Sequence, residues 1–190
     1  SLRIETVKPN RLKIDLDFGK DMIYSDIENL EGKLKVEWLH GAPAGDLRAR
    51  VEVNFNPKNT TFEGYGDYSF VDRSRRFQSR EKVIFDGQLN ASGEAVVRPD
   101  FNLKKKAPGM LNAVFTTRAF EKGGNFSIVS SSIPYSPYPI YVGLKEPEGN
   151  RYGMLVTDSL YNFDIVTLNE TGDPVPKENL EVKVYKLQWR

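Results

Sequence analysis

The chain has 190 residues, of which 39% are hydrophobic and 12% aromatic, enough for one full core and part of a second. Its 27 basic and 26 acidic residues nearly cancel, which excludes a strong overall field for recruiting nucleic acid or an anionic membrane. Cysteine is absent, which excludes disulfides, thiolate zinc sites and a catalytic thiol. No apolar run approaches the ~20 residues of a membrane helix, so no membrane span is expected.

Alternation of apolar and polar residues with period two recurs along the chain and predicts strands with one buried face. In Arg11–Phe18, every second residue from Leu12 is apolar and those between are charged. Seven short strands of this kind indicate an all-β fold, an antiparallel immunoglobulin or fibronectin-like β-sandwich. The predicted strands are Arg11–Phe18, Lys33–Leu39, Leu47–Phe55, Lys82–Leu89, Glu94–Arg98, Met110–Phe120 and Asn125–Ile133.

Two of the connections between these strands have a distinctive composition. The loop His40–Asp46 is rich in turn-forming residues and joins its strands either as a hairpin or as a crossover between two sheets. The stretch Asn56–Arg80 contains several aromatic residues without regular spacing. We predict that this stretch is a long loop folded against the sandwich.

A domain boundary is expected at Pro134–Pro139, where three prolines in six residues stiffen the backbone and remove hydrogen-bond donors. Beyond it, strands are predicted at Ile140–Leu144, Tyr161–Leu168 and Leu180–Trp189. The alternation of the last strand changes face near Val184, which indicates a bulge or burial of both faces.

A weak internal repeat consists of a strand, a turn cluster with proline, and a strand that begins with leucine. Val36–Pro43 leads to Leu47–Val53, and Val166–Pro174 leads to Leu180–Val184. This order predicts one module used twice. We expect residues 1–8 to end a preceding linker or domain, residues 9–138 to form a complete sandwich, and residues 139–190 to start a second, incomplete copy. Both ends lie within alternating stretches, so we expect a piece of a longer protein.

Five segments carry a family resemblance: Pro9–Lys13, Trp38–Ala44, Gly124–Ser127, Tyr135–Tyr138 and Tyr141–Leu144. Together they resemble bacterial alpha-2-macroglobulin-like protease inhibitors, and the sequence Trp-Leu-His-Gly-Ala-Pro-Ala is the most specific part. The resemblance covers nearly the whole chain. It implies macroglobulin β-sandwich domains of a protein that traps proteases in host defence, located in the periplasm, the cell envelope or outside the cell.

The resemblance also implies what this chain does within such a protein. Many members bond to the trapped protease through a Cys-x-Glu-Gln thioester, which this sequence lacks. Its implied part is scaffolding, with proteases as partners only of the full-length protein, and with neighbouring domains or a second copy as direct partners. Leu180–Arg190 would be an early strand of the domain into which the cleavable bait segment is inserted, downstream of Arg190. Structural roles are expected for Trp38, Gly41, Pro43, Tyr135, Pro137 and Trp189.

Catalysis and cofactor binding are not expected. His40 is the single histidine and sits in a Gly/Pro-rich turn, without a second histidine or a cysteine to build a triad or a metal site. The basic clusters Arg73–Arg76 and Lys104–Lys106 are interpreted as solvated edges. An alternative function is a carbohydrate-binding or adhesin-type sandwich that stacks sugars on aromatic residues. The tyrosines available for this are Tyr65, Tyr68, Tyr135, Tyr138 and Tyr141.

We further expect Trp38 to anchor the core, because it shares a face with Leu34 and Val36. The second copy would leave open strand edges, which predicts that its apolar side chains pack on the first module or on another chain. The side chains concerned are Phe163, Ile165, Val182, Val184, Leu187 and Trp189.

Overall fold

The computed structural model describes residues 9–101, 103, 106–149 and 154–183, and every regular element in this part is a β-strand. The part described contains no helix long and apolar enough to cross a membrane. The chain folds into two compact units. The first contains the residues up to Thr60 together with Val71–Pro139, and the second contains Thr61–Phe70 together with the residues from Ile140 onward.

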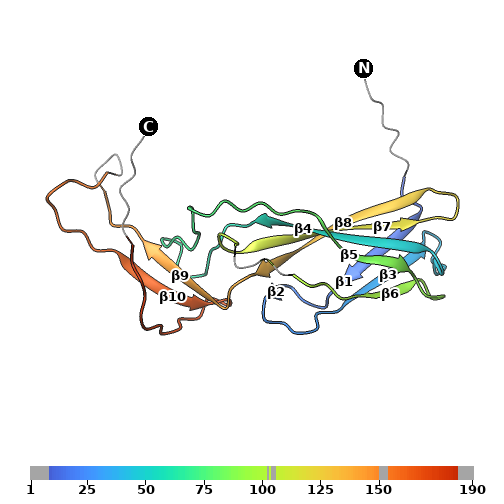
Figure 1. The fold of residues 1–190 in the computed structure, drawn as a ribbon, viewed down its shortest axis with the longest axis horizontal. Helices are drawn as coiled ribbons and strands as arrows, with labels where there is room; N and C mark the ends of the chain where they lie inside the picture. The colour runs from blue at the N-terminus through green and yellow to red at the C-terminus, as the bar shows by residue number, and fades with distance from the viewer. Residues whose placement is uncertain (1–8, 102, 104–105, 150–153, 184–190) are drawn as a thin grey trace, which may run out of the picture. The chain divides into compact units, whose positions relative to one another are not determined.

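The first unit is a sandwich of two sheets (Figure 1). One sheet is antiparallel and has the order β1-β3-β6. The other has the order β2-β8-β7-β4-β5 and is antiparallel except where β2 runs parallel to β8. The all-β sandwich predicted from the alternation is therefore confirmed. The strands are β1 (Leu12–Asp17), β2 (Ile23–Tyr24), β3 (Gly32–Trp38), β4 (Arg48–Pro57), β5 (Lys82–Gln88), β6 (Glu94–Val97), β7 (Leu111–Phe120) and β8 (Phe126–Ser136).

The connection from β3 to β4 is a crossover, because the two strands belong to different sheets. This decides between the hairpin and the crossover that the sequence allowed. The chain turns tightly after Trp38, where the Gly41 amide donates to the Trp38 carbonyl (2.8 Å), and then enters the second sheet.

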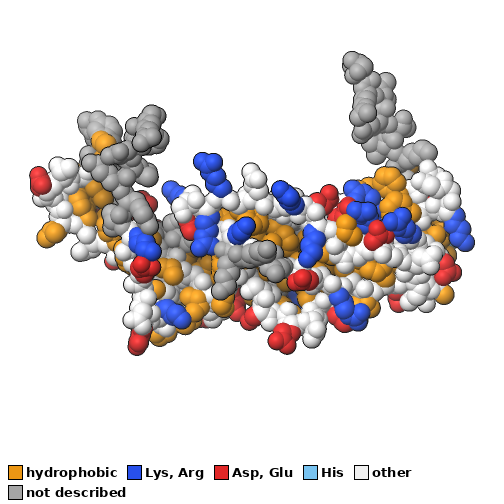
Figure 2. All heavy atoms as spheres, in the orientation of Figure 1, with side chains coloured by type: hydrophobic (Ala, Val, Ile, Leu, Met, Phe, Trp, Pro, Cys, Tyr) orange, Lys and Arg blue, Asp and Glu red, His pale blue; other side chains and the backbone are white. Residues whose placement is uncertain are grey.

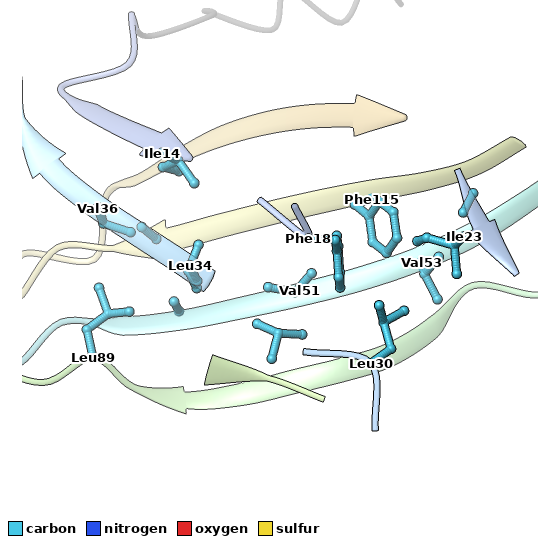
Figure 3. Packing of buried hydrophobic residues seen from close by; sticks show 14 of the residues in the cluster. Ile14, Phe18, Ile23, Leu30, Leu34, Val36, Val51, Val53, Leu89 and Phe115 are labelled. Carbon is cyan, nitrogen blue, oxygen red and sulfur yellow. The ribbon is translucent and has the colours of Figure 1, made fainter. Parts of the chain in front are cut away.

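The core lies between the two sheets of the first unit. Figure 3 shows Ile14, Leu34 and Val36 from the smaller sheet opposite side chains from β4 and β7. Phe115 is fully buried, and its ring centroid lies 4.8 Å from that of Phe18. Each apolar side chain buried in this way contributes roughly 1.5–3 kcal/mol of transfer free energy, so the first unit holds a complete core.

Strand β2 has no counterpart among the predicted strands, because a two-residue strand shows no periodicity. It is fixed by burial of Ile23, which is 1% exposed, and by pairing with Tyr135 and Ser136. The Ser25 amide continues this pairing by donating to the Ser136 carbonyl (3.0 Å). The end of β8 next to the prolines is thereby part of the sheet.

The second unit is built on two antiparallel strands, β9 (Ile140–Lys145) and β10 (Asp164–Asn169). It also contains Thr61–Phe70, so the prediction that the whole of Asn56–Arg80 folds against the first sandwich is wrong for these ten residues. The strand predicted at Leu180–Trp189 is not formed at Leu180–Lys183, where no partner strand is present among the described residues. Its remainder lies outside those residues.

The internal repeat corresponds to one turn built twice. After β3, the Trp38 amide donates to the Ala42 carbonyl (2.8 Å), and after β10 the Asn169 amide donates to the Asp173 carbonyl (2.9 Å). Gly41 and Gly172 occupy the same place in the two turns with φ of 90° and 96°. This left-handed conformation strongly favours glycine. In both copies the proline that closes the turn bridges back to the preceding strand, as Pro43 to Glu37 and Pro174 to Leu168.

Candidate functional site: the open sheet of the second unit

One face of the β9–β10 sheet is covered by the aromatic residues of Thr61–Phe70. The rings of Phe62 and Phe70 meet edge to face with centroids 4.8 Å apart, and Phe62 also contacts Tyr141 at 5.5 Å. Tyr141 is 3% exposed and Leu168 is fully buried. An excursion of the first unit's chain therefore supplies part of the core of the second unit.

Gly143 lets this excursion approach the strand. A Cβ at Gly143 would lie 2.6 Å from Cζ of Phe70 and 2.9 Å from Cγ1 of Val166, so a larger residue would collide with both. The backbone joins the contact, because the Ser69 amide donates to the Leu144 carbonyl (2.9 Å) and the Leu144 amide donates to the Ser69 carbonyl (3.0 Å). Thr61–Phe70 is held as a short third strand would be.

An ion pair lies at the end of the same contact. Lys145 Nζ is 3.3 Å from a carboxylate oxygen of Asp67, and this hydrogen bond raises the pKa of Lys145. Both groups are open to solvent, and such surface pairs contribute only about 0–1 kcal/mol. The ion pair therefore orients Asp67 and adds little to stability, which comes from the aromatic packing.

The opposite face of the β9–β10 sheet carries three apolar side chains that are open to solvent. Val142 is 51% exposed, and Leu144 and Ile165, which lie opposite each other in the register, are 39% and 41% exposed. We call Val142, Leu144 and Ile165 the open face. A contiguous apolar surface on a sheet more often marks an interaction site than a surface that stays exposed to water in the functional protein.

Packing of the second unit's apolar side chains on the first module or on another chain stays a prediction. Phe163, Ile165 and Val182 are all exposed, Val182 by 68%. Among the described residues, the aromatic side chains of Thr61–Phe70 pack on the other face of this sheet. The remaining predicted members, Val184, Leu187 and Trp189, lie outside the described residues.

Three of the residues expected to have structural roles lie at the turn after β3. Trp38 is partly buried at the rim of the core, with its ring stacked near His40 (centroids 6.5 Å apart) and the Arg11 guanidinium 5.8 Å from its ring centroid. Gly41 provides the left-handed residue of the turn, and Pro43 forms its closing bridge. Trp38 thus caps the end of the sandwich and does not lie at its centre.

The other expected structural residues lie where the first unit's last strand ends. Tyr135 is 2% exposed and sits between Phe55 and Phe101, with centroid distances of 5.2 and 5.6 Å. Burial raises the pKa of Tyr135 to about 12. Pro137 is half-buried one position after the end of β8. Trp189 lies outside the described residues.

Tyr138 fastens the same end of the first unit to a distant loop. Its hydroxyl donates to the Ala107 carbonyl (2.6 Å) and accepts from the Arg75 guanidinium (2.7 Å). Burial is the main cause of the raised pKa of Tyr138. The tyrosine therefore combines a packed ring with a hydroxyl that holds two segments far apart in sequence.

The described residues offer no cluster of side chains for metal binding. His40 is exposed in its turn, and no group of three His, Cys, Asp or Glu side chains in the described part could hold a metal ion. The tyrosines proposed to stack sugars are also not gathered on one surface. Tyr135 and Tyr141 are buried, while Tyr65 and Tyr68 pack on each other edge to face at 5.7 Å.

Sequence reasoning missed the residues that build this site, namely Phe62, Phe70 and Gly143. Phe62 and Phe70 carried a signal, because two aromatics in an irregular loop have to be buried somewhere. The surface that buries them could not be predicted, because it lies some seventy residues away and the irregular spacing of the aromatics does not show which strand they cover.

Comparison with known proteins relates both parts of the chain to bacterial macroglobulin domains. Residues 10–131 match the family model of the bacterial alpha-2-macroglobulin MG5 domain, and residues 143–190 match that of bacterial macroglobulin domain 6. The alpha-2-macroglobulin homolog of Yersinia pestis is 21% identical over 192 residues, a match that takes in 100% of this chain and 9% of that protein. The chain thus spans about a tenth of the length of this relative.

Solved structures show the same fold. Native alpha-2-macroglobulin from E. coli aligns with a TM-score of 0.60 and 19% identity, covering 88% of this chain and 11% of that one. The Salmonella alpha-2-macroglobulin reacted with methylamine gives a TM-score of 0.59 and 19% identity over 90% of this chain and 12% of that one. With a family model that matches more than half of its residues, the chain belongs to the bacterial alpha-2-macroglobulin family.

Proposed function

We propose that this chain is a non-catalytic scaffold segment of a protein that traps proteases. Residues 9–138 act as one macroglobulin module, and residues 139–190 contribute strands to a second. The observation that supports this role best is the open face, a sheet surface prepared for contact with another part of a larger protein. Related E. coli proteins are described as activated by porcine elastase and by trypsin, which supports proteases as the partners of the complete protein.

The composition of the open face suits a permanent contact between domains. Val142, Leu144 and Ile165 carry no charge, and their removal from water contributes about 25 cal/mol for each Å² buried. Interfaces that stay closed are apolar at their centre in this way. The complete protein operates in the periplasm, in the cell envelope or outside the cell, where it meets foreign proteases.

Cysteine labelling tests whether the open face is covered in the complete protein. The chain has no cysteine of its own, so Val142→Cys introduces a single reactive thiol within it. The thiol should react rapidly in the isolated chain and at least about tenfold more slowly in the complete protein, where neighbouring strands exclude the reagent. Leu168→Cys, at a buried position, is the slow-reacting control. Equal rates for Val142→Cys in both proteins would contradict the proposal.

Activity assays test the non-catalytic part of the proposal. The isolated chain should neither hydrolyse peptide substrates nor inhibit trypsin or elastase, whereas the complete protein should inhibit. Turnover by the isolated chain that His40→Ala abolishes would show instead that the chain is an enzyme.

A further inference from the structure

A groove in the first unit brings together two basic segments that are distant in sequence. It has a volume of about 620 Å³. Residues 76–80 and 82 form one wall, and residues 100, 101, 103 and 106 form the other. Arg76 belongs to the first basic cluster of the sequence and Lys106 to the second, and both line this groove. The fold thus brings together basic residues from two clusters that are interpreted from the sequence as separate, solvated edges. Figure 2 shows several Lys and Arg side chains along the segment that leads into β5 (green in Figure 1).

The charge of the groove departs from that of the chain. The whole chain is nearly neutral, with a formal charge of +1, but four basic residues and one acidic residue line the groove. Lys82 is bonded to Asp100, whose carbonyl accepts from its ammonium group at 2.6 Å. Among the described residues, no ion pair involves Arg76, Arg80 or Lys106, although most of the other arginines of the first unit are paired.

The floor of the groove is aromatic and rigid. Phe55, Phe77 and Phe101 contribute to it, and the rings of Phe55 and Phe101 meet edge to face at 5.2 Å. Phe101 also contacts the buried rings of Tyr135 and Phe115, at 5.6 and 6.3 Å. The floor is therefore continuous with the core of the sandwich, which fixes its shape before any ligand binds.

The walls are also held in place. The Ser79 hydroxyl accepts from the Phe55 amide (2.9 Å) and fixes the first wall to strand β4. On the second wall, the Leu103 amide donates to the Phe101 carbonyl (3.1 Å), and the Lys106 amide donates to the Leu103 carbonyl (3.2 Å). A preformed cleft with apolar lining and a few placed charges has the character of a binding site.

From this arrangement we infer that the groove binds an acidic peptide segment that carries one large apolar side chain. The apolar side chain contacts Phe77 and Phe101 on the floor, and carboxylates on either side of it bind the free cations on the walls. Unpaired arginines beside aromatic rings match carboxylates both by charge and by their planar donor geometry. Binding of this kind is a function of the first unit alone and does not depend on the open face or on protease trapping.

Binding of short peptides to the full 190-residue chain tests the inference. The probe is the capped peptide Glu-Asp-Phe-Asp-Glu, and its controls are the same peptide with Ser in place of Phe and a version with Lys in place of the acids. The acidic Phe peptide should bind, and both controls should bind at least about tenfold more weakly, a difference of about 1.4 kcal/mol. Raising the salt from about 50 mM to about 500 mM should weaken its binding several-fold.

Charge reversal in the chain provides the matched comparison. Arg76→Glu with Arg80→Glu should weaken binding about tenfold or more, because it replaces attraction by repulsion. Lys20→Glu with Lys122→Glu changes the net charge equally at exposed sites away from the groove and should leave the affinity within about twofold. All four side chains are exposed, and a thermal melt checks that both variants fold.

Three results would overturn the inference. The first is absence of binding by the acidic Phe peptide. The second is equal loss of binding in the two charge-reversed variants, which would indicate a general charge effect. The third is stronger binding to phosphatidylglycerol vesicles than to the peptide, lost with Arg76→Glu and Arg80→Glu, which would assign the groove to an anionic membrane surface.

Discussion

The two units of this chain bury apolar surface in different ways. In the first, two sheets close over a core to which nearly every strand contributes, and Phe115 at its centre has no exposed surface. In the second, a two-stranded sheet packs on one face against a loop that leaves the first unit, and its other face is open. The first unit is stabilised within itself, whereas the second draws part of its core from a segment distant in sequence.

The largest effect is expected at the centre of the first unit. Phe115→Ala should lower the free energy of unfolding by about 3–5 kcal/mol, because it removes a buried ring and leaves a cavity among Phe18 and its neighbours. Urea denaturation followed by fluorescence measures this. A loss below about 1 kcal/mol would mean that the core of the first unit is not closed as described.

The ionisation of Tyr135 tests the same core by pH. Its pKa is raised from 10.0 to about 12 in the folded chain, so between these values the unfolded state loses the proton while the folded state keeps it. Stability should therefore be unaffected below pH 10 and should fall by roughly 2–3 kcal/mol as the pH rises to 12. Tyr135→Phe should lack this part of the decline. An identical decline in the variant would contradict the burial of the phenol.

A substitution in the second unit should act locally. Gly143→Ala places a Cβ against Phe70 and Val166, and overpacking of this kind costs about 1–3 kcal/mol. Hydrogen exchange should accelerate in β9, β10 and the segment 61–70, while the amides of β4 and β7 keep their protection. Gly123→Ala is the control, because its Cβ would meet no atom within 4 Å. Faster exchange throughout the first unit would show that the two units do not unfold separately.

The two copies of the repeated turn give the smallest and most closely matched comparison. Gly41→Ala and Gly172→Ala each force a side chain into a left-handed conformation, which costs roughly 1 kcal/mol. The Cβ at position 172 would also lie 3.0 Å from Phe62, whereas the one at position 41 meets nothing within 4 Å. Local exchange should therefore accelerate more for Gly172→Ala. The opposite order would mean that Phe62 does not pack under this turn.

Local patterns predicted the strands of the first unit well, and long-range contacts explain what was missed. Alternation located strands such as Gly32–Trp38 because one face of each is buried, but two residues at Ile23–Tyr24 show no period. The repeat around Gly41 and Gly172 could be recognised from the sequence because the turn requires glycine and proline at fixed positions. Which unit would bury Phe62 and Phe70 depends on packing across the fold, which spacing in the sequence does not encode.

The central claim is that Thr61–Phe70 forms part of the second unit although the chain on both sides of it belongs to the first. Native-state hydrogen exchange of the Leu168→Ala variant tests it most directly, because Leu168 is fully buried and is paired with Tyr141, which Phe62 contacts. The Ser69 amide, which donates to the Leu144 carbonyl, should then exchange faster together with the amides of β9 and β10, with β4 and β7 unchanged. Unchanged protection of Ser69, or protection that follows β4 and β7, would contradict the account.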